Sequence, residues 1–247
     1  MSDADVLAAL HALGLRAGRD ALQAWLAHAT QSRLAPVQVV EGLIDVERRV
    51  RAATNLARRT RTAALGTIPA LDGFDWNHPR RIDRPLYETL LGLDFVRAGE
   101  NVLLRGPSGV GKTTLAQNLG VRALTQGRHV RFTTLAGCVA DLLKQESSPA
   151  LERRLRRYTT PDLLVVDEIG FLPCEHRAAD LLFTIISRRH EKRSTVITTN
   201  LSYKEWSSVF PGAACVVALV DRFAQHCHVL DIDADSWRQK ASRARRK

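Results

Sequence analysis

Apolar residues change their spacing along the chain, and the change falls near residue 100. Before it they recur every three or four positions, which is the repeat of an amphipathic helix. After it, short apolar runs alternate with helical stretches. Helices are predicted at residues 3–15, 20–30, 36–59, 85–96, 111–126, 135–145 and 178–190. Strands are predicted at residues 101–105, 128–133, 163–167, 194–199 and 228–232.

This order of elements predicts an α/β fold with a parallel sheet between helices, preceded by a small all-helical N-terminal domain. Residues 66–100 are punctuated by Gly66, Pro69, Gly73, Pro79 and Pro85 and are expected to form a linker leading into the core. The predicted domains are therefore residues 1–65, helical and basic, and residues 66–247, which carry the sheet. Ligands of such sheets bind at the carboxyl ends of the strands.

The strand at residues 101–105 leads into a sequence that matches G-x-x-x-x-G-K-[ST] without a mismatch, and a helix follows it. Glycines let backbone N–H groups surround phosphate oxygens, and the helix N-terminus favours negative charge. Lys112 is expected to reach the β- and γ-phosphates of ATP and the Thr113 hydroxyl to ligate Mg²⁺. The predicted nucleotide-binding residues are Gly106, Pro107, Ser108, Gly109, Val110, Gly111, Lys112, Thr113, Thr114 and Asp167.

Two acidic residues follow the four apolar residues 163–166. Asp167 is expected to emerge beside the phosphate loop and to hold Mg²⁺ with Thr113, whereas Glu168 is placed to polarise the attacking water. The alternative is that the pair only caps the following turn. An adjacent Asp-Glu is typical of ATP hydrolysis in P-loop proteins with an additional strand, and no guanine-reading N-K-x-D is present.

A polar side chain also ends the strand at residues 194–199. Asn200 is expected to orient the lytic water or to contact the γ-phosphate. An asparagine after a strand is otherwise a common turn residue.

The formal net charge is +10, which favours a polyanionic partner such as nucleic acid over a merely solvated basic surface. Two helical segments carry the arginines. In the third helix Leu43, Val46, Val50, Ala53 and Ala57 form an apolar stripe, and arginines cover the other side. With Glu47 as their nearby acidic neighbour, these arginines are expected to be largely uncompensated, which suits contacts to phosphate better than mutual salt bridges. In residues 148–158 the apolar face is Leu151, Leu155 and Tyr158. The predicted DNA-binding residues are Arg48, Arg49, Arg51, Arg58, Arg59, Arg153, Arg154, Arg156 and Arg157.

The cysteines Cys138, Cys174, Cys215 and Cys227 show no C-x-x-C spacing, so neither a zinc site nor a redox pair is expected. No signal peptide or membrane span is predicted, and we expect a cytoplasmic protein with no membrane partner.

In order and spacing, these elements resemble an AAA+ ATPase. Further strings are similar to the IstB transposition-helper family, relatives of the DnaC helicase loaders: residues 99–104, 151–155, 161–164, 179–183, 186–189, 194–202 and 219–223. The resemblance covers about residues 35–240.

The resemblance implies an ATPase that self-assembles into a spiral or ring on double-stranded DNA and presents that DNA to a partner transposase. ATP then lies between subunits, and a neighbour supplies an arginine finger. Arg222 matches the finger by position, with Arg188 a second candidate and Arg238 a candidate sensor of nucleotide. A DnaC-like helicase loader is the runner-up, and a nucleotide-binding scaffold with negligible hydrolysis is the alternative from another class.

Overall fold

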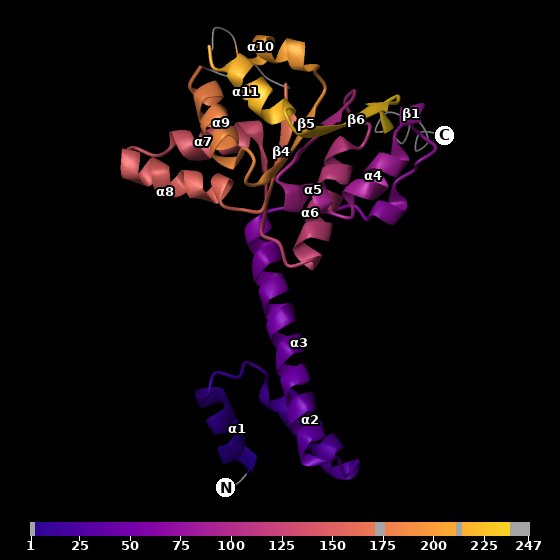
Figure 1. Ribbon diagram of the computed structural model, residues 1–247, viewed down its shortest axis with the longest axis vertical. Helices are drawn as coiled ribbons and strands as arrows, with labels where there is room; N and C mark the ends of the chain where they lie inside the picture. Colours follow the sequence, from indigo (N-terminus) through magenta and orange to yellow (C-terminus); the bar gives the residue numbers. More distant parts are fainter. Residues whose placement is uncertain (1–2, 171–175, 211–213, 238–247) are drawn as a thin grey trace, which may run out of the picture. The chain divides into compact units, whose positions relative to one another are not determined.

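The computed structural model describes residues 3–170, 176–210 and 214–237 (Figure 1). The chain divides into two compact units, residues 1–59 and residues 60–247. This division falls six residues before the boundary expected from the sequence, and the assignment of two domains stays a prediction. Within the described residues, no helix combines the length and the apolar character needed to cross a bilayer.

The first unit consists of α1 (Asp3–Ala12), α2 (Arg19–Gln31) and the first part of α3 (Pro36–Ala63). Leu22 and Val46 are buried at the centre of its small core. Trp25 lies against α3 and donates its indole N–H to the Val39 carbonyl at 3.1 Å. A glycine is required beside it, because a Cβ at Gly42 would lie 2.0 Å from the Trp25 ring.

The second unit is built on a six-stranded sheet in the order β1-β6-β2-β5-β4-β3. Its strands are β1 (Arg81–Ile82), β2 (Asn101–Arg105), β3 (Val130–Thr134), β4 (Leu163–Ile169), β5 (Ser194–Thr199) and β6 (Cys227–Asp233). Every pairing is parallel except β1 with β6. The predicted parallel sheet is confirmed, and β5 is the additional strand between the P-loop strand β2 and the acidic strand β4.

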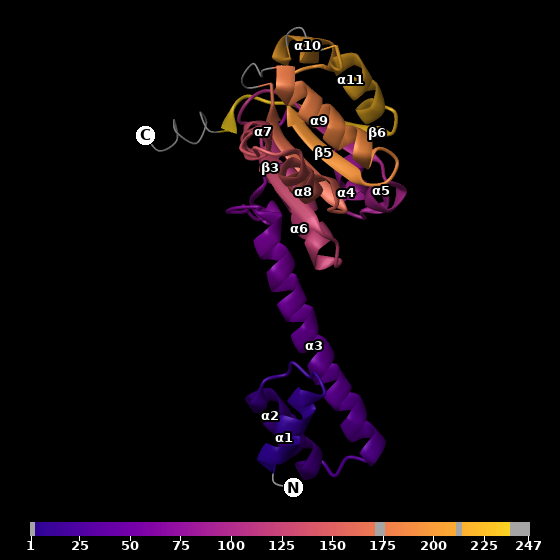
Figure 2. The same cartoon turned by 90° about the vertical axis from the view of Figure 1, so that its left-hand side faces the viewer.

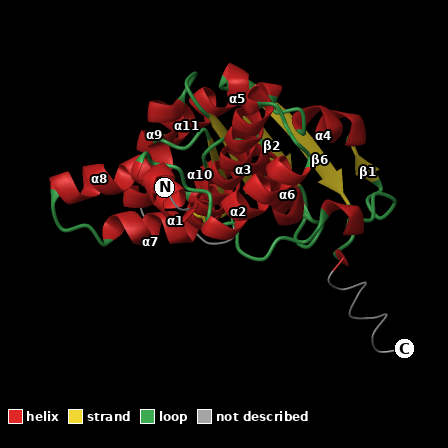
Figure 3. Cartoon of the chain, turned by 90° about the horizontal axis from the view of Figure 1, so that it is seen from below, coloured by secondary structure: helices red, strands yellow, loops and turns green. Residues whose placement is uncertain are grey.

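Helices cover both faces of this sheet (Figure 3). They are α4 (Arg84–Leu90), α5 (Asp94–Ala98), α6 (Lys112–Thr125), α7 (Leu135–Leu143), α8 (Ser148–Thr159), α9 (His176–Arg189), α10 (Trp206–Val209) and α11 (Val216–Ala224). Short 3₁₀ turns are η1 (Leu71–Gly73) and η2 (Tyr203–Glu205).

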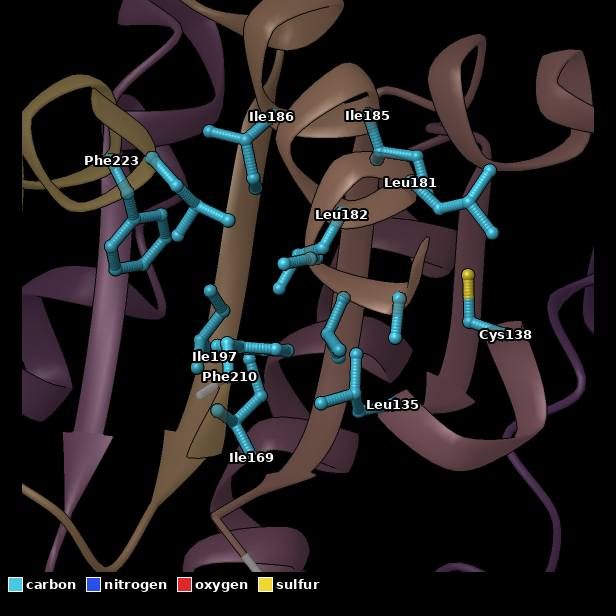
Figure 4. Packing of buried hydrophobic residues seen from close by; sticks show 14 of the residues in the cluster. Leu135, Cys138, Ile169, Leu181, Leu182, Ile185, Ile186, Ile197, Phe210 and Phe223 are labelled. Carbon is cyan, nitrogen blue, oxygen red and sulfur yellow. The ribbon is translucent and has the colours of Figure 1, made fainter. Parts of the chain in front are cut away.

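One face of the sheet packs against α7, α8, α9, α10 and α11, and α9 and α11 lie side by side (Figure 2). The core on this face contains Leu135, Ile169, Ile186, Ile197 and Phe223 (Figure 4). Because side chains alternate along a strand, the intervening strand residues face the other side, where α6 contacts β2 to β5. The sheet is therefore buried on both faces, as its continuous apolar strands require.

A buried arginine joins the ends of several elements at the amino-terminal edge of the sheet. Arg189 donates to Thr195 Oγ1 at 3.0 Å and to the carbonyls of Tyr158 and Pro161 at 3.0 and 2.8 Å. It also donates to the Ser194 carbonyl at 2.5 Å. Burial lowers the pKa of Arg189 to about 9, so the guanidinium stays protonated at neutral pH.

The prediction of a single helix at residues 85–96 is wrong. The structure has α4 and α5 there, separated by Leu93 with a φ of 65°. Asp83 caps α4 by accepting the Leu86 N–H at 2.9 Å, and Gly99 ends α5 in the left-handed conformation. The two-residue strand β1, the four-residue helix α10 and the nine-residue helix α11 were not predicted from the sequence.

Candidate nucleotide-binding site

The loop between β2 and α6 can only be built from glycines at three of its positions. Gly109 and Gly111 have φ of 80° and 95°. A Cβ at Gly106 would lie 2.3 Å from the Ile232 carbonyl oxygen, and one at Gly111 would lie 2.6 Å from the Phe74 ring. The loop therefore keeps its backbone open toward the space in front of α6, where the N–H groups of the first helical turn lack helical partners.

Lys112 is the first residue of α6, and its side chain is buried. Its ammonium donates to the carbonyls of Gly106 and Pro107, each at 2.7 Å. The positive charge is thus held over the loop itself. This position suits an ammonium that neutralises phosphate oxygens bound by the loop.

Oxygen atoms gather beside Lys112. The Thr113 hydroxyl donates to the two carboxylate oxygens of Asp167 at 3.1 and 3.0 Å. Asp167 is 3% exposed, so its carboxylate needs these partners. Hydroxyl and carboxylate oxygens are ligands that Mg²⁺ accepts, and a partly hydrated ion needs only one or two protein ligands.

A bulge in β4 brings both acidic residues to one site. Val166 pairs with Ile197 and Ile169 with Thr199, so Asp167 and Glu168 together face the single residue Thr198. Consecutive residues of a regular strand point to opposite faces. Glu168 instead has a φ of 65°, and both carboxylates line the same cavity.

The Thr198 hydroxyl holds the bulge. It accepts the Glu168 N–H at 3.0 Å and donates to Asp167 Oδ1. Thr198 is 1% exposed and lines the cavity, so one buried hydroxyl fixes both the backbone of Glu168 and the carboxylate of Asp167. Sequence reasoning missed Thr198, because nothing local distinguishes it from the other threonines of β5.

The cavity has a volume of about 300 Å³. The loop, Thr113 and the two acids form one side, and Phe74, His78 and Trp237 line it elsewhere. The rings of His78 and Trp237 lie 4.9 Å apart, and the Trp237 backbone N–H donates to the Gly109 carbonyl at 3.0 Å. The volume is at the lower end of the roughly 300–1,000 Å³ typical of small-molecule sites.

The sequence left open whether Phe74 and Trp76 contact a bound base or pack on the core. Phe74 lines the cavity, whereas Trp76 packs between Phe74 and Tyr87, with centroid distances of 4.7 and 5.5 Å. The Arg84 guanidinium lies 5.2 Å from the Trp76 ring. His78 and Trp237 were not found from the sequence, since they approach the loop only through the fold.

The structure does not bring Asn200 or Arg222 into this cavity. Asn200 is exposed directly after β5, beside Gly170. Arg222 lies on α11, where its guanidinium donates to Ser187 Oγ and lies 4.9 Å from the Phe183 ring. Among the described residues, Arg222 forms no ion pair with the neighbouring Asp221. Arg238 lies outside the described residues.

The arginines of α3 are more compensated than the sequence analysis expected. Arg51 pairs with Glu47 and donates to the Gly14 carbonyl at 3.0 Å, and Arg48 lies 3.7 Å from Asp45. The hydrogen bond from Arg51 lowers the pKa of Glu47. Glu47 also accepts backbone N–H groups of residues 16 and 17, so it is a structural acid of the first unit.

Only part of the apolar stripe expected on α3 is covered. Leu43, Val46 and Val50 pack in the small core, whereas Ala53 and Ala57 are exposed. Arg49 and Arg58 are also exposed, and Arg59 is half-buried. The outward arginine face therefore exists, but with acidic neighbours along part of it.

The arginines of α8 differ from one another as well. Leu155 and Tyr158 are buried as predicted, and Arg153 and Arg156 are exposed. Arg154 instead forms a two-pronged hydrogen bond to Asp141 of α7. Burial raises the pKa of the Asp141 carboxyl, but hydrogen bonds from Arg154 and Tyr158 outweigh it and lower the pKa overall.

Together, the inserted strand β5, the glycine loop before α6 and the acidic end of β4 define a P-loop protein of the AAA+ class. Its sheet order, with the acidic and P-loop strands separated by one strand, is what the sequence resemblance implied.

The chain belongs to the IstB-like ATP-binding protein family, whose model matches residues 8–245. The ATP-binding protein of insertion sequence IS21 from Pseudomonas aeruginosa is 38% identical over 185 residues, 75% of this chain and 70% of that protein. The corresponding protein of insertion sequence IS232 from Bacillus thuringiensis subsp. berliner is 33% identical over 209 residues, 85% of this chain and 84% of that protein.

Among solved structures, the DnaC helicase loader superposes with a TM-score of 0.51 at 20% sequence identity. The match covers 64% of this chain and 98% of that chain, and it shows a shared fold. The chain is thus an IstB-like, insertion-sequence type of ATP-binding protein with a fold related to helicase loaders.

Proposed function

We propose that this protein hydrolyses ATP with Mg²⁺, assembles on duplex DNA in the cytoplasm and presents that DNA to a partner transposase. The observation that carries the proposal is that, among the described residues, no arginine of the same chain lines the nucleotide cavity. Lys112, Thr113, Asp167 and Glu168 converge on one cavity, whereas Arg222 is held on α11 away from it. A site that needs an arginine finger is then completed only by a second subunit, which couples hydrolysis to assembly.

The residues of the cavity fit ATP and its metal. Lys112 neutralises the β- and γ-phosphates, Thr113 and Asp167 hold Mg²⁺, and Phe74 packs against the base. Bound Mg²⁺ supplies positive charge that stabilises the transferring phosphoryl oxygens. Glu168 accepts the proton of the attacking water. Asn200, at the end of β5, orients this water once the neighbouring subunit closes the site.

DNA binding is assigned to the arginine faces of α3 and α8. Arg49 and Arg58 of α3 and Arg153 and Arg156 of α8 are exposed to solvent. Contacts to phosphate carry no sequence information, so binding is expected to be strongly salt-dependent and weakly sequence-specific. Residues 1–65 are proposed to act as a separate helical module that binds DNA or a partner.

A DnaC-like helicase loader is the second candidate, because the fold resembles that of the DnaC loader. The ATPase core is common to both candidates, so the two functions are distinguished by the kind of DNA that the protein prefers to bind. Tighter binding to duplex than to single-stranded DNA of the same length supports the transposition function. The reverse preference supports the loader.

Two variants test whether the site is shared between two subunits, because each variant removes a different part of it. Glu168→Gln keeps Arg222 as a donor for its neighbour, and Arg222→Ala keeps its own Glu168. Each variant alone is expected to bind a fluorescent ATP analogue but to lose DNA-stimulated hydrolysis. An equal mixture is expected to recover about a quarter of the parent turnover, if subunits mix at random across heterologous interfaces.

No recovery in the mixture, with both variants assembled on DNA, would remove Arg222 from the neighbouring site. Turnover of Glu168→Gln equal to that of the parent would show that Glu168 is not the base. A parent protein without any DNA-stimulated hydrolysis would favour the nucleotide-binding scaffold. Electron microscopy with duplex DNA, with and without ATP, reports the assembly separately.

A further inference from the structure

A second cavity of about 730 Å³ lies in the second unit, residues 60–247, and shares no lining residue with the nucleotide cavity. It is formed by the last turn of α3, the beginning of β3 and the end of α8. Four basic side chains line it: Arg61, His129, Arg131 and Arg157. We call it the basic cavity. Because β3 begins here, the cavity is at the amino ends of the strands, opposite the phosphate loop.

Arg131, which lines the cavity, has one N–H donor that no described residue uses. One guanidinium N–H donates to the Thr62 carbonyl at 3.1 Å, and the guanidinium lies 5.9 Å from the Tyr158 ring. Its Nε is buried and has no hydrogen-bond partner among the described residues. Burial, and then the nearby charge of Arg157, lower the pKa of Arg131. An anion in the cavity relieves the repulsion between Arg131 and Arg157.

The acids nearby are already engaged elsewhere. Asp141 lies 3.6 Å from Arg157, but it accepts hydrogen bonds from Arg154 and Tyr158. Asp162 lies 3.7 Å from His129, and it accepts the His129 backbone N–H at 2.8 Å. The described residues around the basic cavity therefore leave a net positive charge.

We propose that the basic cavity binds backbone phosphates of duplex DNA, in addition to the exposed Arg153 and Arg156 of α8. Arg157, predicted from the sequence as part of the α8 face, lines this cavity. The inference rests on the proposed DNA binding and extends it to Arg61 and Arg131, which sequence reasoning did not assign. Its cations come from three elements and no glycine lines it, which differs from the compact glycine loop that holds a nucleotide. Guanidinium groups spread over an open cavity suit successive phosphates of a strand.

The test is a double variant, Arg61→Gln with Arg157→Gln, because both side chains are exposed and their loss leaves the core intact. Its matched control is Arg84→Gln with Arg97→Gln, two exposed arginines that pair with acids on their own helices. Both variants lower the net charge by two. Affinity for a short duplex is measured by fluorescence anisotropy over a range of salt concentrations.

We expect the slope of log K against log salt to fall by about 2 in the double variant, since each lost phosphate contact removes about 0.9. Affinity at low salt falls roughly 10- to 100-fold, and the control stays within about twofold of the parent. Arg131→Lys keeps the charge but loses the planar guanidinium group. It is expected to weaken DNA binding while the slope of log K against log salt stays near that of the parent. Binding of a fluorescent ATP analogue is unchanged in all of them.

Arg61 and Arg157 also lie in the last turns of their helices, where a basic residue stabilises the helix dipole. If they have only this role, the double variant has a lower melting temperature but the same affinity for DNA as the control variant. This result would overturn the proposal. A parent that binds no duplex DNA overturns the proposed DNA function and this site with it. A parent that binds DNA while the double variant matches the control overturns the site alone.

Discussion

Replacing Thr198 by valine removes a hydroxyl from the centre of the site while keeping nearly the same shape. Two hydrogen bonds are lost, one from the Glu168 N–H at 3.0 Å and one to the Asp167 carboxylate. A bond to a charged acceptor contributes about 1.5–3 kcal/mol and an unsatisfied donor costs about 1–3 kcal/mol. Because Glu168 is exposed and can relax, we expect a loss of about 2–4 kcal/mol in the free energy of unfolding.

The effect on catalysis is expected to be larger than the effect on binding. Glu168 holds its position at a φ of 65° only while Thr198 keeps its N–H, and a shift of about 1 Å in a reacting group costs roughly 100-fold in rate. We therefore expect kcat for ATP to fall about 10- to 100-fold. The KM is expected to change less than kcat, because the described hydrogen bonds of the Thr198 hydroxyl go to Asp167 and Glu168 and not to the phosphate loop.

Thr195 provides the matched control, because it is a second threonine of β5 with 1% exposure. Its hydroxyl accepts from Arg189 at 3.0 Å, far from the acids, so Thr195→Val is expected to lower the melting temperature without lowering kcat. Thr198→Ser keeps the hydroxyl and is expected to keep a kcat close to that of the parent. Steady-state kinetics and thermal melts on the same samples give both quantities. Equal loss of kcat in the two valine variants, or no loss in Thr198→Val, would refute the reasoning.

Three further variants probe buried or charged groups. Asp141→Asn is expected to reduce the loss of stability that the parent shows at acid pH. Hydrogen bonds from α8 lower the pKa of Asp141 more than burial raises it. The carboxylate therefore contributes its full stability at neutral pH and loses it as the pH falls below about 4. Urea unfolding between neutral and acid pH measures this. Arg189→Met leaves buried carbonyls unpaired and costs at least about 3 kcal/mol by the same assay, whereas the partly exposed Arg193→Met costs under about 1 kcal/mol. Phe74→Ala weakens binding of a fluorescent ATP analogue about tenfold, and unchanged affinity removes Phe74 from the base.

The parts of the site that the sequence could predict are those carried by consecutive residues. A glycine loop between an apolar strand and a helix, followed by an acidic pair after four apolar residues, is a combination typical of nucleotide-binding proteins. It predicts Lys112, Thr113, Asp167 and Glu168 as site residues, and the structure brings these four to one cavity. The bulge was not predictable, because it depends on how β4 and β5 are registered. Only that register shows that Thr198, one of three threonines in β5, faces both acids.

Long-range partners account for the remaining differences. Nothing near Arg154 in the sequence indicates that Asp141, on another helix, removes it from the solvent-facing row. The helix predicted at residues 85–96 was broken because Leu93 adopts a left-handed conformation that the local pattern gives no reason to expect. Likewise His78 and Trp237 reach the nucleotide cavity from positions far apart in the sequence.

The hydrogen bonds of Arg188 and Arg222 distinguish these two candidate fingers, and the buried Arg189 serves as a comparison. A guanidinium has five N–H donors, and one that is already satisfied must break bonds before it can bind a phosphate. Arg189 is buried with all its nitrogens engaged, and Arg188 forms two bonds to Glu152, at 2.6 and 2.9 Å. Among the described residues, Arg222 has one side-chain hydrogen bond, to the neutral hydroxyl of Ser187, and an aromatic contact. Arg222 would therefore break fewer hydrogen bonds than Arg188 on moving to a neighbour's phosphate, which supports its proposed role as the arginine finger.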